Sequence, residues 1–157
     1  MSEPATGERR FRLSVLGVIA AGGAVGASAR YALGEAFPVQ AGRIPWTTLA
    51  INVSGAFVLG MLLTVLSERR VLERLPLARY VRPFAAIGVL GAFTTFSTFA
   101  VESDLLIKDG HAGAAIAYDL LSLVLGLGAA YLGIVVGRLW RGIRRRTAHY
   151  EQGLEDA

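Results

Sequence analysis

The chain has 157 residues, of which 54% are hydrophobic, and its formal net charge at pH 7 is +4. This composition is too apolar for an ordinary soluble domain and fits a compact bundle of membrane helices. The sequence has no cysteine, which excludes disulfides, thiolate metal sites and thiol catalysis. Because the arginines flank apolar segments, membrane topology accounts for the positive charge better than nucleic-acid binding does.

The first apolar segment, about residues 13–34, follows a short basic N-terminus and contains a single charged side chain, Arg30. At this length we interpret it as a transmembrane helix rather than the core of a signal peptide. Gly22 and Gly26 form a GxxxG step, which lets helices approach closely. Because Arg30 lies near the end of the span, it either extends to the membrane surface or attracts anions to a vestibule.

The second segment, about residues 46–66, begins at Trp46, a residue type that is common at membrane interfaces. Asn52, Ala56 and Gly60 recur every four residues and place one amide on a face of small side chains. An unsatisfied amide is expensive inside a membrane. Asn52 therefore either forms an interhelical hydrogen bond or donates to an anion in the space beside it.

The third segment, about residues 83–101, has the most unusual composition. Its centre, Gly88–Phe99, combines glycines, phenylalanines and hydroxyl side chains, and both glycine and β-branched threonine weaken a helix. We therefore expect this helix to be broken in the middle of the membrane, where irregular backbone needs protein or a water-filled path. Carbonyl oxygens freed between Gly91 and Thr94 would be ligands for a hard cation such as Na⁺. From spacing alone, this cation site is a minor alternative.

Two phenylalanines and three hydroxyl side chains follow the expected break. Phe96 and Phe99 are three residues apart and share one helical face. They either pack against lipid and protein or turn the positive edges of their rings toward an anion. Thr95, Ser97 and Thr98 either bond back to the preceding turn or form a polar track as a cluster. Together these residues indicate the lining of an ion site.

The fourth segment, about residues 112–137, precedes a tail, residues 138–157, that is first basic and then acidic. Tyr118 and Ser122 are four residues apart and would extend a hydroxyl-lined path along one face. Asp119 would repel an anion, so we favour a structural role for it near the N-terminus of this helix. We expect the end of the tail to lack regular structure.

Four spans place both termini and the central loop on one side of the membrane. That side carries thirteen of the sixteen lysines and arginines, whereas the other carries only Arg43 and Lys108. Basic loops tend to stay in the cytoplasm. We therefore predict a single membrane domain, residues 1–157, that crosses the cell membrane several times and has both termini in the cytoplasm.

Four helices make a thin bundle, and the sequence shows no internal repeat that would build an inverted pair within one chain. The glycine faces therefore favour a pathway that forms by dimerisation. The sequence contains neither HExxH nor a phosphate loop, and both histidines lie in polar flanks. An enzyme is therefore not expected.

Three motifs resemble those of one known family. The segments Gly22–Tyr31, Thr48–Gly55 and Gly91–Phe99 are similar, in this order, to motifs of the CrcB/Fluc fluoride ion channels. The third motif, GAFTTFSTF, is long and specific, and the resemblance covers residues 13–137. It implies a fluoride-selective channel that passively exports fluoride from the cytoplasm and so lowers its toxicity.

The resemblance also implies an antiparallel dimer in the bilayer, with two fluoride pathways and a structural Na⁺ on the dimer axis. Gly91 and Thr94 would offer backbone carbonyls to that Na⁺, and Arg30 would lie near the vestibule. The role of Glu102 stays open. Neutral amide, hydroxyl and ring-edge groups would line the pathway, from Asn52, Thr95, Phe96, Ser97, Thr98, Phe99, Tyr118 and Ser122.

Two features depart from the family pattern. Ala92 stands where the family often has glycine, which stiffens the break slightly. The strong arginine bias favours one fixed orientation, whereas an antiparallel homodimer must insert in both. The second subunit is therefore either the same chain or, as we hypothesise, an oppositely oriented homologue.

Two other functions compete with the channel. A proton-coupled exporter of the small multidrug-resistance type also has four short spans, but it needs a carboxylate in the first span, where this chain has Arg30. A non-transporting assembly subunit would explain the glycine faces alone. It would leave the hydroxyl and phenylalanine cluster without a role.

Overall fold

The computed structural model describes the backbone of residues 6–67 and 78–155, and side chains within residues 10–67 and 79–142. This part of the chain contains helices and connecting turns. Four of its segments are long and apolar enough to cross a membrane, which confirms the predicted number of spans: Arg10–Ala36, Trp46–Leu66, Arg79–Lys108 and Ala112–Gly142. Several arginines counted for the topology lie outside the described side chains: Arg9, Arg69, Arg70, Arg74, Arg144, Arg145 and Arg146.

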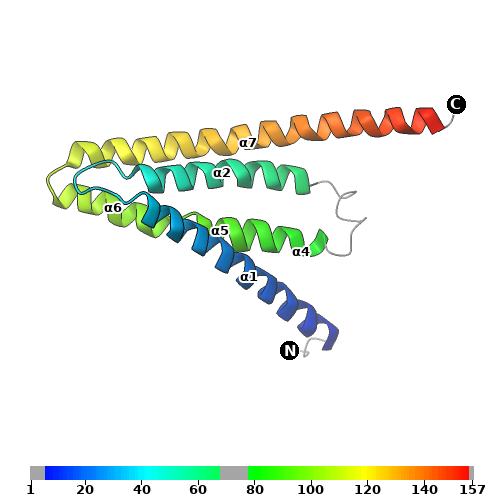
Figure 1. Ribbon diagram of the computed structural model, residues 1–157, viewed down its shortest axis with the longest axis horizontal. Coiled ribbons are helices and arrows are strands. Elements are labelled where there is room, and N and C mark those ends of the chain that lie inside the picture. The colour runs from blue at the N-terminus through cyan, green and yellow to red at the C-terminus, as the bar shows by residue number, and fades with distance from the viewer. Residues whose placement is uncertain (1–5, 68–77, 156–157) are drawn as a thin grey trace, which may run out of the picture.

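The helices follow one another in an up-and-down order. In Figure 1 the α1–α2 loop and the α6–α7 turn lie at one end of the bundle, and the start of α1 and the end of α7 lie toward the other. Gly42 in the first of these connections has a φ of 72°, which favours glycine. The elements are α1 (Thr6–Ala36), α2 (Trp46–Leu66), α4 (Ala78–Arg82), η1 (Pro83–Leu90), α5 (Gly91–Phe93), α6 (Phe96–Lys108) and α7 (Ala112–Glu155).

The third span begins earlier than the sequence indicates. Helical structure starts at Ala78, and Pro83 lies within it as the first residue of η1, a wide π-helical turn. Proline has no N–H to donate and disturbs an ordinary helix, whereas π-helical turns occur inside helices, frequently at functional sites. Pro83 therefore changes the winding of this span and does not mark its start.

Glycines bring helices of this chain into backbone contact. A Cβ atom on Gly26 would collide with the carbonyl oxygen of Val89 in η1. Between α2 and α7, a Cβ atom on Gly60 would collide with the carbonyl of Ala130, and one on Gly133 with that of Phe57. The close approach predicted for the GxxxG step is confirmed, but its partner is η1 of the same chain. These glycine faces therefore do not argue for a dimer.

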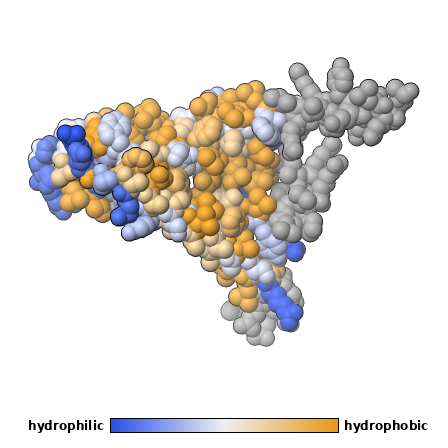
Figure 2. All heavy atoms as spheres, viewed as in Figure 1, coloured by the Kyte–Doolittle hydropathy of each residue, from blue (hydrophilic) through white to orange (hydrophobic). Residues whose placement is uncertain are grey.

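Apolar residues lie mostly on the outside of the bundle. The one cluster of buried apolar side chains in the described residues is small and joins α2, α6 and α7 through Leu49, Leu106, Ala115 and Tyr118. Figure 2 shows hydrophobic residues over the middle of the visible face and hydrophilic residues at the end that holds the loops. This distribution fits a protein whose solvent is lipid.

The fourth helix continues beyond its predicted end. We expected no regular structure near the end of the tail, but α7 extends to Glu155. Residues 138–155 contain no proline and include five arginines, two leucines and two glutamates, residue types that favour helix. As far as Glu155 the prediction was wrong, because these residues carry sufficient helix propensity to prolong a helix that has already formed. Asp156 and Ala157 lie outside the described residues.

Candidate ion pathway

The third span changes its backbone geometry between α5 and α6. Thr94 has φ −75° and ψ 154°, and Thr95 has φ −146° and ψ 121°, so both residues are extended. The side chain of Thr95 then caps α6, because its Oγ1 accepts a hydrogen bond of 3.1 Å from the Thr98 N–H. Two extended residues leave peptide groups outside the helical ladder, and these groups need other partners.

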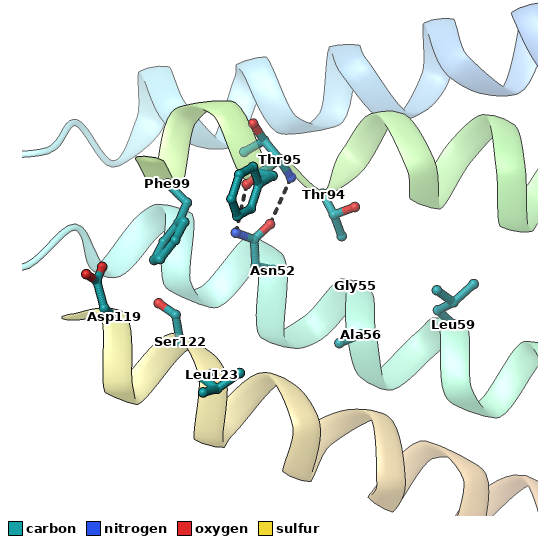
Figure 3. Close-up of a pocket in the computed structure, with 11 residues that line it drawn as sticks. Asn52, Gly55, Ala56, Leu59, Thr94, Thr95, Phe99, Asp119, Ser122 and Leu123 are labelled. Atoms are coloured by element: carbon teal, nitrogen blue, oxygen red, sulfur yellow. Dashed lines mark hydrogen bonds between the residues drawn. The ribbon is translucent and has the colours of Figure 1, made fainter. Parts of the chain in front are cut away.

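Asn52 supplies partners to Thr95 from α2. Its Oδ1 accepts a hydrogen bond of 2.9 Å from the Thr95 N–H, and its Nδ2 donates one of 3.0 Å to the Thr95 carbonyl (Figure 3). The amide thus pairs with both polar groups of the extended residue. Nδ2 carries a second hydrogen, which these two bonds do not use. The interhelical hydrogen bond considered from the sequence is present, and a donor is left over.

Arg30 contacts the same segment from α1. Its Nε donates a hydrogen bond of 3.0 Å to the carbonyl of Ala92, two residues before the first extended residue. Sequence reasoning placed Arg30 at a vestibule or at the membrane surface and missed this contact with the third span. A lone charge within an apolar span is itself a signal that some polar group lies opposite it.

A first pocket lies beside the extended segment, with a volume of about 430 Å³. It brings together six of the residues singled out from the sequence: Asn52, Thr94, Thr95, Phe96, Phe99 and Ser122. In Figure 3, Asn52 projects from α2, and Ser122, Leu123 and Asp119 project from α7 toward the same space. The pocket combines mainly apolar walls with a few convergent polar groups, which is typical of binding sites.

A second pocket, of about 420 Å³, shares Thr95 with the first. Arg30, Thr98 and Glu102 also line it. Ser97 lines neither pocket, and its hydroxyl lies 3.3 Å from Thr95 Oγ1. Thr95 therefore lies where a space lined by hydroxyl and charged side chains of both signs meets a largely apolar space.

Three aromatic rings run from the surface of the chain into its core. The ring centroids of Phe96 and Phe99 are 5.8 Å apart, and those of Phe99 and Tyr118 are 5.1 Å apart. Phe96 is 79% exposed, whereas Tyr118 is fully buried. Phe96 and Phe99 share the wall of the first pocket, as their spacing of three residues predicts.

Glu102 gathers hydroxyl groups from two other helices. Its carboxylate accepts hydrogen bonds of 2.8 Å from Thr48 Oγ1 on α2 and of 2.8 Å from Tyr118 Oη on α7. The structure therefore separates Tyr118 from Ser122, which were expected on one path. Ser122 lines the first pocket, whereas the Tyr118 hydroxyl bonds to Glu102. The sequence feature that could have indicated a role for Glu102 is its position, because a carboxylate three residues after Phe99 lies on the same helical face.

The described side chains contain no cluster of three or more histidine or acidic residues that could hold a metal ion. A cation here would therefore need backbone carbonyls. Gly91 is exposed, and a Cβ atom built on it would have only the Ala86 carbonyl within 4 Å. Thr94 is extended, so its carbonyl points away from the regular helical ladder.

Comparison of the sequence with known families agrees with this arrangement. Residues 17–134 match the sequence pattern of the family described as CrcB-like protein, Camphor Resistance (CrcB). The chain belongs to this family. The match includes the first glycine step, Asn52, the extended segment and Ser122, so both pockets lie within the region that defines a CrcB-like protein.

Several proteins similar in sequence to this chain are named as fluoride-specific ion channels. The chain is 50% identical over 139 residues to "Fluoride-specific ion channel FluC 3" of Streptomyces avermitilis, across 88% of this chain and 66% of that protein. It is 46% identical over 130 residues to "Fluoride-specific ion channel FluC 1" of Mycobacterium bovis, across 83% and 94%. A FluC protein of Magnetococcus marinus is 43% identical over 122 residues. The matched region thus spans slightly less than two thirds of the Streptomyces protein and nearly all of the Mycobacterium one.

Proposed function

We propose that this chain forms a fluoride-selective ion channel through which fluoride leaves the cytoplasm passively. The observation that carries the proposal is the identity of 50% and 46% with two proteins named as fluoride-specific ion channels. The site agrees with it, because two pockets meet at Thr95, and the neutral donors Asn52, Thr98 and Ser122 are among the residues that line them. Such a channel would lower the toxicity of fluoride to the cell.

The donor chemistry suits fluoride. A small, strongly hydrated anion must exchange its water for several donors, and these must hold it weakly enough for release. Asn52 Nδ2 has a hydrogen to spare, and the positive ring edges of Phe96 and Phe99 add weak attraction without a fixed charge. Thr95, Thr98 and Ser122 would supply hydroxyls from the pocket walls, and Ser97 would act through its contact with Thr95 Oγ1. Tyr118 would act on the pathway through Glu102.

The extended residues would interrupt the third span within the bilayer. Thr94 and Thr95 lie well inside the candidate span Arg79–Lys108. Asn52 and Arg30 support the backbone on both sides of this interruption, which is the condition under which irregular backbone is tolerated in lipid. Arg30 would also place a positive charge in the second pocket, beside Glu35 and Glu102, and this pocket would serve as a vestibule.

The channel would be an antiparallel dimer. Phe96 is 79% exposed although it belongs to the proposed pathway, so a single chain leaves the pathway open on that side. A second subunit would close it, either the same chain or an oppositely oriented homologue. The distribution of lysine and arginine supports one fixed orientation, with both termini in the cytoplasm of a cell-membrane protein.

A structural Na⁺ would fit between the two subunits. Gly91 and Thr94 would offer their backbone carbonyls, since one is exposed and the other is extended. Arg30 occupies the carbonyl of Ala92, which lies between them. Two carbonyls from one chain are too few for a hard cation, so the second subunit would have to supply more. The ion would join the subunits by electrostatic attraction.

Fluoride efflux from liposomes tests the channel directly. Purified protein is reconstituted in liposomes loaded with fluoride and chloride, and release is followed with ion-selective electrodes. We expect fast fluoride release without chloride release, either from this chain alone or after co-expression with a homologous subunit. Release of neither ion from either preparation would contradict the proposal. Activity of the chain alone would refute the need for a different partner.

A further inference from the structure

An arginine contacts aromatic rings of two helices at the end of the bundle where α1 begins. The guanidinium carbon of Arg79 in α4 lies 4.9 Å from the ring centroid of Tyr80 and 5.5 Å from that of Phe11 in α1. The two rings are also neighbours, with centroids 6.2 Å apart. Both arginine distances are within the range of a cation–π contact. Figure 1 shows the start of α1 and α4 toward the same end of the bundle, so Arg79 lies between the first and the third span.

The donors of this guanidinium have no carboxylate partner among the described side chains. The one ion pair in the described part of the chain joins Lys108 to Asp104, at the opposite end of the third span. No aspartate or glutamate occurs in the described residues that run from the Arg79 end past the middle of the bundle, 10–34, 56–67, 79–101 and 120–142. A guanidinium has five N–H groups in a planar fork. Contact with ring faces leaves the edge of that fork open to an anion.

Three more arginines lie next to this contact in the sequence. Arg10 and Arg12 flank Phe11 on α1, and Arg82 follows Arg79 by three residues on α4. All four arginine side chains are exposed. An anion at this end of the bundle would therefore meet positive charges from two helices at once.

The arginines lie at the depth of the lipid headgroups. The candidate span Arg10–Ala36 has 27 residues and is therefore about 40 Å long, which matches the thickness of a bilayer with its headgroup regions. Phe11 is the second residue of this span, and aromatic side chains are common at that level. Farther along the third span, Phe84 and Ile87 are 38% and 57% exposed. They offer an acyl chain an apolar surface that begins beside the arginines.

We propose that Arg79 binds the phosphate of an anionic phospholipid, in a headgroup site that joins α1 to α4. The edge of the guanidinium donates two parallel hydrogen bonds to phosphate oxygens while the two rings contact its faces. Arg10, Arg12 and Arg82 add positive charge, which favours an anionic headgroup over a zwitterionic one. The site shares no residue with either pocket, so the inference goes beyond the proposed channel function and is independent of it.

Lipid competition, read by native mass spectrometry, tests this site. The purified full-length protein in neutral detergent is mixed with equal amounts of phosphatidylglycerol and phosphatidylcholine that have the same acyl chains. The lipids that stay bound to each chain are then counted. We expect wild-type protein to retain phosphatidylglycerol in preference to phosphatidylcholine. Equal retention of the two lipids would overturn the inference.

Variants of one arginine separate a site from general charge attraction. Arg79→Gln should weaken phosphatidylglycerol binding by roughly 10- to 100-fold, through the loss of charge-assisted hydrogen bonds. Arg79→Lys keeps the charge without the planar fork and should lose less. Arg138→Gln is the matched control, because it removes an exposed arginine near the end of the fourth candidate span. Its binding should fall by at most about fivefold, the effect of one surface charge. Equal losses in Arg79→Gln and Arg138→Gln would overturn the inference.

The aromatic contact is tested by Phe11→Leu, which keeps every charge and an apolar side chain. Loss of one cation–π contact should weaken phosphatidylglycerol binding by roughly two- to fivefold. Thermal unfolding gives a second measurement, because each variant is compared with itself in the two lipids. Phosphatidylglycerol should raise the unfolding temperature of wild-type protein more than phosphatidylcholine does, and this difference should shrink in Arg79→Gln. An undiminished difference in Arg79→Gln would overturn the inference. Neither measurement uses fluoride, so a failure here would leave the proposed channel function standing.

Discussion

The two halves of α2 are attached to the rest of the molecule in different ways. Toward its C-terminal end, Gly60 lies against the α7 backbone, and Gly133 of α7 lies against the backbone of Phe57. Toward its N-terminal end, Thr48 and Asn52 form hydrogen bonds to Glu102 and Thr95 of the third span. One half is therefore held by close apolar packing, and the other by polar groups.

The difference suggests two roles for one helix, since the packed half supports the bundle and the polar half faces the proposed pathway. Close backbone packing leaves neither space nor free polar atoms, and it resists deformation. The polar half leaves both, because Asp119 Oδ1 and Ser122 Oγ beside the first pocket have no hydrogen-bond partner among the described side chains. An ion needs unoccupied donors and room to pass, and the polar half supplies the donors of the proposed pathway. The packed half keeps the helices at the spacing that the polar contacts require.

The largest effect on fluoride efflux is expected from Asn52→Asp, which removes a hydrogen bond from the polar half of α2. The carboxylate can still accept from the Thr95 N–H, but it cannot donate to the Thr95 carbonyl, and it adds a negative charge to the pocket. An unpaired buried group costs about 1–3 kcal/mol, so fluoride efflux should fall by roughly 10- to 100-fold. Ser54→Ala is the control, because Ser54 is exposed and bonds only to Ile51 within its own helix. Wild-type efflux by Asn52→Asp would refute the role of this amide.

The packed half is tested by Gly133→Ala. The added methyl group would collide with the carbonyl oxygen of Phe57, so we expect a loss of about 1–3 kcal/mol in stability from overpacking. Gly128→Ala on the same helix meets no atom within 4 Å and should gain up to about 1 kcal/mol from its better helix propensity. Thermal unfolding in detergent compares the two variants. If both variants shifted the unfolding temperature in the same direction, backbone contact would not distinguish these two glycines.

Local sequence patterns predicted the elements better than they predicted the contacts. The predicted bounds of the second span agree with those of α2, because a proline and a tryptophan of the interfacial type mark its start. The common face of Phe96 and Phe99 follows from helical periodicity alone. Both predictions use residues that are close in sequence, so no knowledge of distant partners is needed.

Contacts between distant residues could not be predicted in this way. Tyr118 and Ser122 have the spacing of neighbours on one face, yet the long tyrosine side chain reaches Glu102 while the short serine faces the pocket. The contact of Arg30 with Ala92 joins residues 62 positions apart. The GxxxG step indicated close packing, but a glycine face does not specify whether its partner is the same chain or another. These outcomes depend on how the helices assemble.

The smallest effect, a change in thermal stability, is expected from Arg141→Met. Arg141 lies next to the end of the packed half of α2. Arg141 Nη1 donates hydrogen bonds of 3.1 Å to the Thr64 carbonyl and of 3.1 Å to Ser67 Oγ, and it thereby caps the C-terminus of α2 from α7. Methionine keeps the apolar part of the side chain and removes the donors. We expect a loss of about 1 kcal/mol in thermal stability.

The matched control is Arg138→Met, since Arg138 is exposed on the same helix and its removal changes the membrane charge bias equally. It should unfold at nearly the wild-type temperature. Fluoride efflux from both variants should stay at the wild-type rate, because neither residue lines the first or the second pocket. If Arg141→Met slowed efflux while its stability stayed unchanged, the packed half would take part in conduction, and the division of α2 into a supporting and a conducting half would fail.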